Sequence, residues 1–457
     1  MISIVLLLLV LTATPTSRAS DANPGTNSVL SRPLSMEDAL NLALQQNPNL
    51  RRSRKEIEAS QGVIIQSRAL ALPKLRLNSA FNAMQDSDVD RPPATLSFPF
   101  GTDKNWNAQI RVVQSIYEGG RVTSALRAGK LASDRAFLDY QTAEADTIVA
   151  VEVAYFDVLL GEQQVKVQEA SVELLKNELA DTKRRFDAGT VPRFNVLRAE
   201  VELANAQPRL IRARNLYRVS KNNLVNLLGV DVPREMLEDI PLALNGKLEA
   251  TPLNLDIGKA VALALENRTE LESLRKSEAL RREDIINARS GYKPRVEAYA
   301  GYDAHSSMFT EDLTQDVYGW IAGVQLNWDI FDGLQAKGRI KEAQARKDQA
   351  TLEIEDASRR IELEVRTALS NFREADEVLK SEEKVVEQAE EALRLATARA
   401  QAGSATQLDV LSAQTSLTES RTIHVQALRD YEVARAKLER AVGNTLVQKS
   451  AARTPGA

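Results

Sequence analysis

The stretch RFDAGTVPRFNVLRAE, residues 185–200, returns later in the chain as RAQAGSATQLDVLSAQ, residues 399–414. Gly189 and Gly403 hold the same place in the two copies and lie 214 positions apart. In both copies the glycine ends a long run without proline and a second helical pattern follows it. Because glycine readily adopts the left-handed conformation that closes a helix, each copy is predicted to form a helix, a tight turn and a returning helix.

Residues after each glycine suit the start of the returning helix. Pro192 has the fixed backbone angle that favours the first turn of a helix. Ser404 and Gln407 have the spacing of a capping box, in which two side chains satisfy free backbone groups. The returning helices are predicted over residues 192–228 and 406–442.

The duplication covers most of the chain, as a repeated offset between matching residues shows. The offset of 214 is shared by Tyr117 and Phe331, by Gly119 and Gly333, and by Gly229 and Gly443. Upstream it becomes 221, as for Pro73 and Pro294, so the first copy carries seven extra residues between Pro73 and Tyr117. We predict two structural repeats joined by a linker that contains proline: residues 36–229, 230–256 and 257–443.

Each repeat contains a segment where apolar and polar residues alternate strictly, which predicts a β-hairpin. The hairpins are expected over residues 73–117 and 294–331. A sheet on a soluble core is one interpretation, but the flanking helices are too polar to cover it. About ten alternating residues match a strand that crosses a membrane. The expected lumen set is Arg76, Asn78, Gln109, Arg111, Gln325 and Asn327, and the expected lipid set is Leu77, Ile110, Val324 and Leu326.

Two connections within the hairpins, residues 85–104 and 305–316, are predicted to be extracellular loops. The first reads DSDVDRPPATLSFPFGTDK over residues 86–104, where prolines and charges oppose a continuous strand.

Helical periodicity resumes after each hairpin and lasts for almost 70 residues, as in residues 119–186. Apolar residues recur every seventh position, which indicates helices packed lengthwise as a coiled coil. The two seams comprise Val151, Val158, Val165, Val172, Leu179 and Phe186, then Val365, Phe372, Leu379, Val386, Leu393 and Ala400. An entering helix over residues 36–72 and a returning helix, placed end to end, would match one long helix. Pro208 should kink its returning helix, whereas Thr422 at the equivalent position should not.

The first residues form a short apolar run, Ile2–Ala13, followed by Ser17-Arg18-Ala19. This pattern predicts a signal peptide over residues 1–19, although no Lys or Arg precedes the run. A short N-terminal core helix is the alternative, and the polar sequence that follows directly favours export. An N-terminal extension, residues 20–35, and a disordered tail, residues 444–457, complete the expected organisation. The chain has no cysteine, so no lipid-anchored N-terminal cysteine is expected.

Composition excludes several classes of function. The chain has only two histidines and no cysteine, so most zinc and thiol chemistry is not expected. A net charge of −4 over 457 residues gives no sign of a nucleic-acid partner. No phosphate loop or nucleophile elbow is present in the sequence. We therefore predict neither an enzyme nor a protein with a cofactor or metal.

Several segments in this order resemble the TolC family of outer-membrane efflux and secretion ducts. They are ALNLALQQNPNL, QSIYEGGRV, RFDAGTVPRFNVLRAEVELANAQ, GVQLNWDIFDG and AGSATQLDVLSAQTSL. The resemblance implies a homotrimer with a twelve-stranded β-barrel in the outer-membrane lipid, continued by an α-helical tunnel through the periplasm. It implies passive passage of substrates as the exit duct of a tripartite efflux pump, a type I secretion system or both. The implied partners are a periplasmic adaptor and an inner-membrane transporter of the RND or ABC type.

The resemblance also implies a pore constriction at the periplasmic tips, formed by acidic side chains in the stretch LDVLSA. Asp409 matches the first acidic position, whereas the second is Ser412. Their equivalents in the first repeat are Asn195 and Arg198. A first-turn aspartate that stabilises a helix N-terminus is the alternative interpretation of Asp409. The tip turns, where an adaptor is expected to dock, comprise Arg185, Gly189, Arg399 and Gly403.

Two other functions would account for part of the sequence. A periplasmic adaptor also contains a coiled-coil hairpin, but it lacks four amphipathic strands beside duplicated long helices. A purely structural coiled-coil scaffold would leave those strands unexplained.

Overall fold

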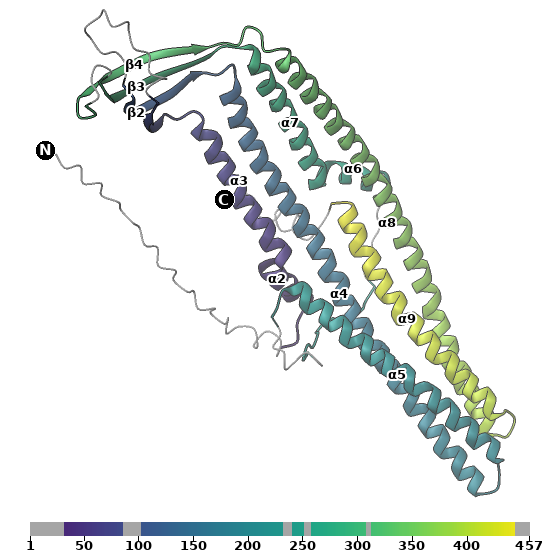
Figure 1. The fold of residues 1–457 in the computed structure, drawn as a ribbon. Helices are drawn as coiled ribbons and strands as arrows, with labels where there is room; N and C mark the ends of the chain where they lie inside the picture. The colour runs from purple at the N-terminus through teal and green to yellow at the C-terminus, as the bar shows by residue number, and fades with distance from the viewer. Residues whose placement is uncertain (1–31, 86–101, 232–239, 251–256, 308–311, 444–457) are drawn as a thin grey trace, which may run out of the picture.

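The computed structural model describes residues 32–85, 102–231, 240–250, 257–307 and 312–443. The predicted signal peptide, residues 20–31 of the extension, the C-terminal tail and most of the 85–104 loop lie outside these residues. The molecule is elongated, with a β-sheet at one end and two helical turns at the other (Figure 1).

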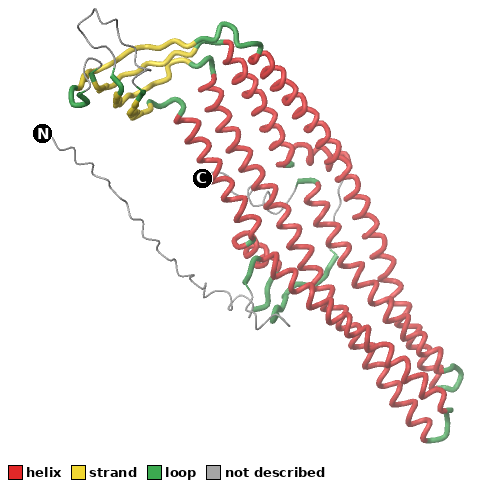
Figure 2. Tube along the Cα trace, in the orientation of Figure 1, coloured by secondary structure: helices red, strands yellow, loops and turns green. Residues whose placement is uncertain are grey.

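The two halves of the chain contain the same α-helices and strands in the same order, and the second half has an additional 3₁₀ turn (Figure 2). The first half comprises α2 (Met36–Gln46), α3 (Pro48–Ala69), β1 (Lys74–Ala83), β2 (Lys104–Tyr117), α4 (Arg121–Asp187) and α5 (Arg193–Leu228). The second comprises α6 (Ile257–Asn267), α7 (Thr269–Arg289), the 3₁₀ turn η3 (Ser290–Tyr292), β3 (Arg295–Ser306), β4 (Asp316–Asn327), α8 (Gln335–Gln401) and α9 (Gln407–Ala441). The predicted combination of long helices with amphipathic strands is confirmed.

The long helices α4 and α8 have 67 residues each, which corresponds to about 100 Å. On the sheet side they are accompanied by α3 and α7, and on the tip side by α5 and α9 (Figure 1). The helix α4 also contacts α7 and α9, and so joins the two halves. The predicted seams are fully buried in mid-molecule, where Val151, Val158 and Val365 have no exposed surface, while Phe186 near the tip is 40% exposed.

The predicted single helix over residues 36–72 is wrong, because it breaks at Asn47 into α2 and α3. The Asn47 side chain accepts hydrogen bonds from the backbone N–H groups of Asn49 and Leu50, and so caps the new helix. Its amide donates to the Leu227 carbonyl at 2.7 Å, which ties the break to the end of α5. The prediction of a kink at Pro208 stays a prediction, since α5 runs through this residue without a break.

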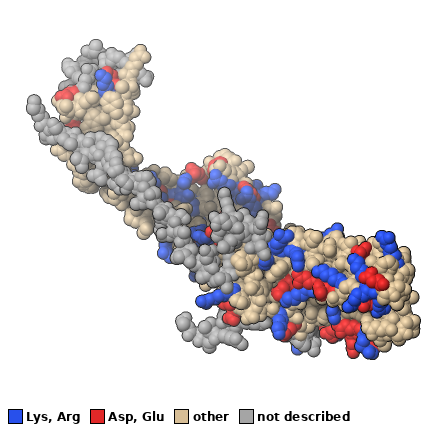
Figure 3. Space-filling view, turned by 90° about the horizontal axis from the view of Figure 1, so that it is seen from below, with Lys and Arg blue, Asp and Glu red and all other residues tan. Residues whose placement is uncertain are grey.

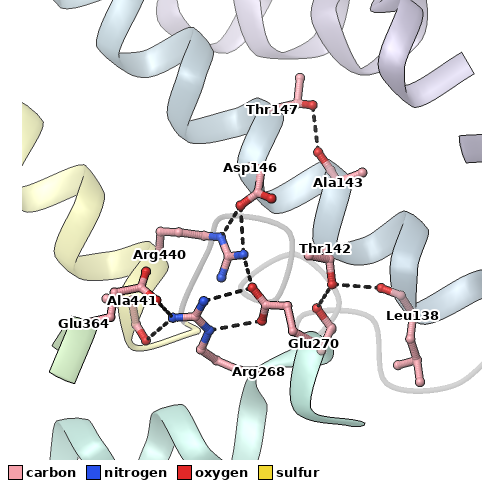
Figure 4. Close-up of polar contacts among 11 residues, drawn as sticks. Leu138, Thr142, Ala143, Asp146, Thr147, Arg268, Glu270, Glu364, Arg440 and Ala441 are labelled. Carbon is pink, nitrogen blue, oxygen red and sulfur yellow. Dashed lines mark hydrogen bonds and ion pairs between the residues drawn. The ribbon is translucent and has the colours of Figure 1, made fainter. Parts of the chain in front are cut away.

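An ion network surrounds two buried arginines, Arg268 and Arg440 (Figure 4). Arg268, between α6 and α7, binds both carboxylate oxygens of Glu270 at 2.9–3.0 Å and the Glu364 carboxylate at 2.7 Å. Arg440 of α9 contacts Glu270 and also donates to Asp146 of α4 at 2.8 Å. The network therefore links the second repeat to the first.

The four strands form an antiparallel sheet in the order β1-β2-β3-β4, with both edges open. Directly opposed residues share one face of a sheet, and Arg76 lies opposite Arg111 while Leu77 lies opposite Ile110. By this register the six residues of the expected lumen set share one face, and the four of the expected lipid set share the other.

The apolar face of the sheet is uncovered in the single chain. Leu77 is 74% exposed, Trp320 81% and Val324 68%. Acidic and basic side chains alternate over the helical end of the molecule instead, while the described part of the sheet end is largely uncharged (Figure 3). Among the described helices, none combines the length and the apolar character needed to cross a membrane.

Candidate pore entrance at the helical tips

The two turns at the tip have the same hydrogen-bonding pattern. Gly189 and Gly403 have φ angles of 77° and 74°, in the left-handed region. In the first turn, the Thr190 N–H donates to the Arg185 carbonyl at 2.9 Å and the Gly189 N–H donates to the Phe186 carbonyl at 2.8 Å. This is the Schellman arrangement, which satisfies the last carbonyls of a helix.

The second turn repeats this arrangement, since the Ser404 N–H donates to the Arg399 carbonyl at 2.9 Å. The Ser404 hydroxyl donates to the same carbonyl at 3.1 Å. The predicted capping box of Ser404 and Gln407 is therefore wrong, because Ser404 belongs to the preceding helix end and not to the start of α9.

The capping box at the start of α9 is formed by Thr406 and Asp409. The Thr406 backbone N–H and hydroxyl both donate to Asp409 Oδ2 at 2.8 Å, and the Asp409 N–H donates to Thr406 Oγ1 at 3.3 Å. Hydrogen bonds from the Thr406 backbone and then from its hydroxyl lower the pKa of Asp409 below its usual value. The first repeat has Pro192 at the capping position and no side-chain cap.

The tips of the two repeats enclose a groove of about 840 Å³ between α4 and α5 on one side and α8 and α9 on the other. One side chain bridges it: Gln407 of α9 donates to Thr182 Oγ1 of α4 at 2.6 Å and to Glu178 at 3.3 Å. Sequence patterns do not reveal this bridge, because its residues lie far apart in the chain and a polar residue near a helix start usually faces solvent.

The structure separates the residues predicted for the constriction into two pairs. Asn195, Arg198 and Arg185 line the groove between the repeats. Asp409 and Ser412 lie three residues apart on α9, and both are exposed. Neither Asp409 nor Ser412 is among the described residues that line this groove.

At the opposite end, the polar face of the sheet carries its own interactions. The Arg111 guanidinium lies over the Tyr299 ring, with Cζ 4.7 Å from the ring centre. His305 Nδ1 and Asp303 Oδ2 are 3.3 Å apart on β3. Within the described residues there is no cluster of side chains suited to hold a metal ion.

The family model described as "Outer membrane efflux protein" matches residues 39–230 and 260–444, and so includes both repeats. The chain belongs to the outer membrane efflux protein family. Members of this family are exit ducts in the outer membrane and not enzymes, so the chain is an outer-membrane duct with a large periplasmic portion.

Individual relatives are distant but similar over nearly the full length. Alkaline protease secretion protein AprF of Pseudomonas aeruginosa is 24% identical, over 89% of this chain and 83% of its own. Outer membrane protein TolC of Escherichia coli K12 is 24% identical, over 87% and 80%. Cobalt-zinc-cadmium resistance protein CzcC of Cupriavidus metallidurans is 25% identical, over 90% of each.

Solved structures share the fold. The Campylobacter jejuni CmeC outer membrane channel aligns with a TM-score of 0.78 at 15% identity, covering 92% of this chain and 88% of that one. The outer-membrane channel OprN aligns with a TM-score of 0.75 at 20% identity, covering 90% of each.

Proposed function

We propose that three copies of the chain assemble into one continuous duct, with a twelve-stranded barrel in the outer membrane and a helical tunnel below it. The observation that carries this proposal is the sheet, whose apolar face is exposed and whose two edges are open. Backbone N–H and C=O groups at an open edge cannot face lipid. The sheet of one chain is therefore incomplete as a membrane structure.

The size of the lumen and the family resemblance both support the number three. Two copies would give eight strands, whose interior fills with side chains, whereas twelve strands leave room for a channel. In such a barrel the polar face of the sheet lines the lumen, and cargo passes it in contact with Arg76, Asn78 and Gln109 rather than with lipid. The apolar face, with Leu77 and Ile110, meets the acyl chains.

The tips form the entrance that controls passage. Asn195 and Arg198 of the first repeat line the groove toward the second repeat within one chain. Asp409 and Ser412 hold the same two positions in the second repeat, so in a ring of copies they face the groove toward the next subunit. Three Asp409 carboxylates then lie around the narrowest part of the pore, where like charges repel one another and favour bound cations.

Family membership implies partners in the periplasm and the inner membrane. We propose that a periplasmic adaptor docks against the tip turns around Gly189 and Gly403, and that an inner-membrane transporter of the RND or ABC type delivers the cargo. The turns are the end of the molecule farthest from the sheet (Figure 1), so they reach deepest into the periplasm. The alternative that this chain is itself a periplasmic adaptor is disfavoured, because its sheet exposes an apolar face.

Purification and conductance test the proposal together. The protein should fractionate with outer membranes, require detergent for extraction, and elute with a molar mass about three times that of one chain. Reconstituted into a planar bilayer, it should give discrete conductance steps. A monomer that is soluble without detergent and gives no conductance would contradict the duct.

Limited proteolysis tests the orientation. The strands β3 and β4 are joined at the end of the sheet away from the helices, since β3 ends at Ser306 and β4 begins at Asp316, so protease added to intact cells should cut within the predicted loop 305–316. Cleavage only after the periplasm has been opened would reverse the orientation.

A further inference from the structure

The β2–β3 pair inside one chain is a template for a contact between chains. It is the place where the first repeat meets the second, and its strands are antiparallel with a defined register. The equivalent contact on the other side of the second repeat would join β4 to β1 of another copy. Both of these strands are open edges in the single chain.

Because the two repeats match residue by residue, the β2–β3 register within the chain predicts the β4–β1 register between chains. Residues of β2 correspond to β4 by an offset of 214, and residues of β1 correspond to β3 by an offset of 221. Within the chain, Ile110 lies opposite Tyr302. Applying both offsets places Val324 of β4 opposite Phe81 of β1 in a second copy.

This register follows from the offsets alone. The side chains that it places opposite each other nevertheless match in polarity, which supports it independently. Apolar residues lie opposite apolar residues: Val324 is opposite Phe81, and Trp328 is opposite Leu77. On the other face Asn327 meets Asn78, and Asp329 meets Arg76. A register displaced by one residue would place each apolar residue on the wrong face.

The charged pair of Asp329 and Arg76 differs in kind from the equivalent contact within the chain. Its template within the chain is the opposition of Ser115 and Glu297. The Asp329 side chain is 68% exposed and lies 3.6 Å from Arg295, and Arg76 is exposed as well. Opposite charges facing each other across strands stabilise the pairing, whereas like charges oppose it.

The end of β4 points to the same partner. The strand β2 extends to Tyr117, and its last residues pair with β3 alone, beyond the start of β1. The equivalent part of β4, Trp328–Phe331, lies outside the strand in the single chain, although Ile330 is 85% and Phe331 80% exposed. A second β1 would supply the missing hydrogen-bonding partner and cover these side chains.

The helices carry a second charged match of the same kind. On the template side, the Ser273 hydroxyl of α7 donates to the Asp139 carboxylate of α4 at 2.5 Å. The same offsets convert this pair into Arg52 of α3 and Glu353 of α8. Both are exposed in the single chain, so a second copy would bring two opposite charges together in the half of α8 that is nearer the sheet.

We propose that β4 of one subunit pairs with β1 of its neighbour in the register set by Val324 and the partner subunit's Phe81, with Asp329 opposite the partner subunit's Arg76. This inference rests on the proposed trimer and specifies how its seam is built. The occupant of the open edges is a second copy of the same chain, because the template contact is made by the chain's own other repeat.

Disulfide crosslinking tests the register directly, since the native chain has no cysteine. Directly opposed residues in an antiparallel pair have Cα atoms about 4.5–5.5 Å apart, within the range that a disulfide spans. The variant Asn78→Cys with Asn327→Cys should therefore form linked dimers and trimers on non-reducing gels. The matched control, Asn78→Cys with Gln325→Cys, is displaced by two residues on the same face, beyond easy reach, and should crosslink at least several-fold less.

The outcomes distinguish this inference from the proposed function. Efficient crosslinking of the displaced pair, with weak crosslinking of the first, would overturn the register and leave a trimer intact. Crosslinking of neither pair in a protein with the mass of one chain would overturn both.

Charge reversal gives a second measurement. Arg76→Asp or Asp329→Arg alone should lower the fraction of oligomer that resists dissociation in mild detergent. The double variant should restore it, because the pair is re-formed with the charges exchanged. If the double variant lost as much resistant oligomer as the two single variants lose together, the Arg76–Asp329 contact would be overturned.

Discussion

Gln407 of α9 donates a 2.6 Å hydrogen bond to Thr182 of α4, and this side-chain contact joins the two repeats at the tip. Thr182 is 4% exposed, so the bond is largely shielded from water. If the tips form the proposed entrance, widening it would separate the two repeats, and this contact should then favour the closed arrangement.

Gln407→Ala should loosen the tips. Loss of a hydrogen bond of this kind costs about 1 kcal/mol, and we expect more frequent transitions to high-conductance states in planar bilayers. Thr182→Val should act in the same direction, and the double variant should add little to either. Gln388→Ala, on the exposed face of α8, is the control and should leave gating unchanged. Additive effects of the two single variants would mean that Gln407 and Thr182 act separately.

Asp409 combines a capping role with the proposed pore role, and two variants separate these roles. Thr406→Ala removes the hydroxyl that caps α9 and keeps the carboxylate, so it should cost about 1 kcal/mol of stability and preserve cation selectivity. Asp409→Ala removes the carboxylate, which accepts from Thr406 in the capping box and lies at the proposed pore, and should reduce the preference for cations, measured by reversal potentials in a salt gradient. Unchanged selectivity in Asp409→Ala would leave Asp409 as a helix cap only.

The two faces of the sheet should tolerate charge differently. Leu77→Arg places a guanidinium on the proposed lipid face and should cost about 2–4 kcal/mol near the bilayer midplane. Asn78→Arg, one residue further on the opposite face, should cost far less because its side chain stays in water. Denaturant unfolding of protein folded into lipid vesicles measures the difference. Equal costs would contradict the assignment of the faces.

The ion network around Glu270 should make the protein sensitive to acid. Although burial opposes it, pairing with Arg268 and Arg440 lowers the pKa of Glu270 from 4.5 to about 2. A folded-state pKa below the unfolded value means that the stabilisation is present above about pH 4.5 and is lost as the pH falls toward 2. At about 1.4 kcal/mol per pKa unit, the loss is at most about 3.5 kcal/mol.

Glu270→Gln should flatten this dependence, as measured by the thermal unfolding of the helical circular dichroism signal between pH 5 and pH 2. Glu391→Gln is the matched control, since the Glu391–Arg394 pair is exposed and contributes little in solvent. The same acid sensitivity in wild type and Glu270→Gln would assign it to other carboxylates.

Sequence periodicity is sufficient to predict the strands and long helices because it records which side of an element meets water. The alternation through Leu75 and Leu77 and the sevenfold spacing through Val151 and Val158 both correspond to elements of the structure. Conversely, the break at Asn47 depends on a hydrogen bond to Leu227, 180 positions away, and no local pattern records such a partner.

Charged residues are the least predictable part. Glu270 and Arg440 resemble ordinary members of solvated helix faces in the sequence, yet they form an ion pair in which the arginine is buried. Their role depends on how α7 and α9 pack, and the first repeat offers no hint because it has Asn49 and Asn226 at the equivalent positions. Likewise, the capping role of Thr406 is hidden because Ser404 offers an equally suitable spacing two residues earlier.

Gly403 should be required for its backbone conformation and not for space. Its φ angle is 74°, and no atom lies within 4 Å of the position that a Cβ would occupy. Gly403→Ala should therefore cost about 1 kcal/mol from left-handed strain alone, and Gly403→Val more, because a β-branched residue tolerates this region poorly. Gly338 in α8 is the control: it also has open space but no positive φ angle, so Gly338→Ala should be neutral or stabilising by up to about 1 kcal/mol.

Two measurements place this effect in the tip rather than in the whole molecule. Hydrogen exchange should accelerate around residues 399–409 in Gly403→Val, while the ion network and the sheet keep their protection. Crosslinking to the cognate adaptor should fall in the same variant, because the turn proposed to receive it has changed shape. Normal crosslinking with a distorted turn would move the docking surface away from Gly403.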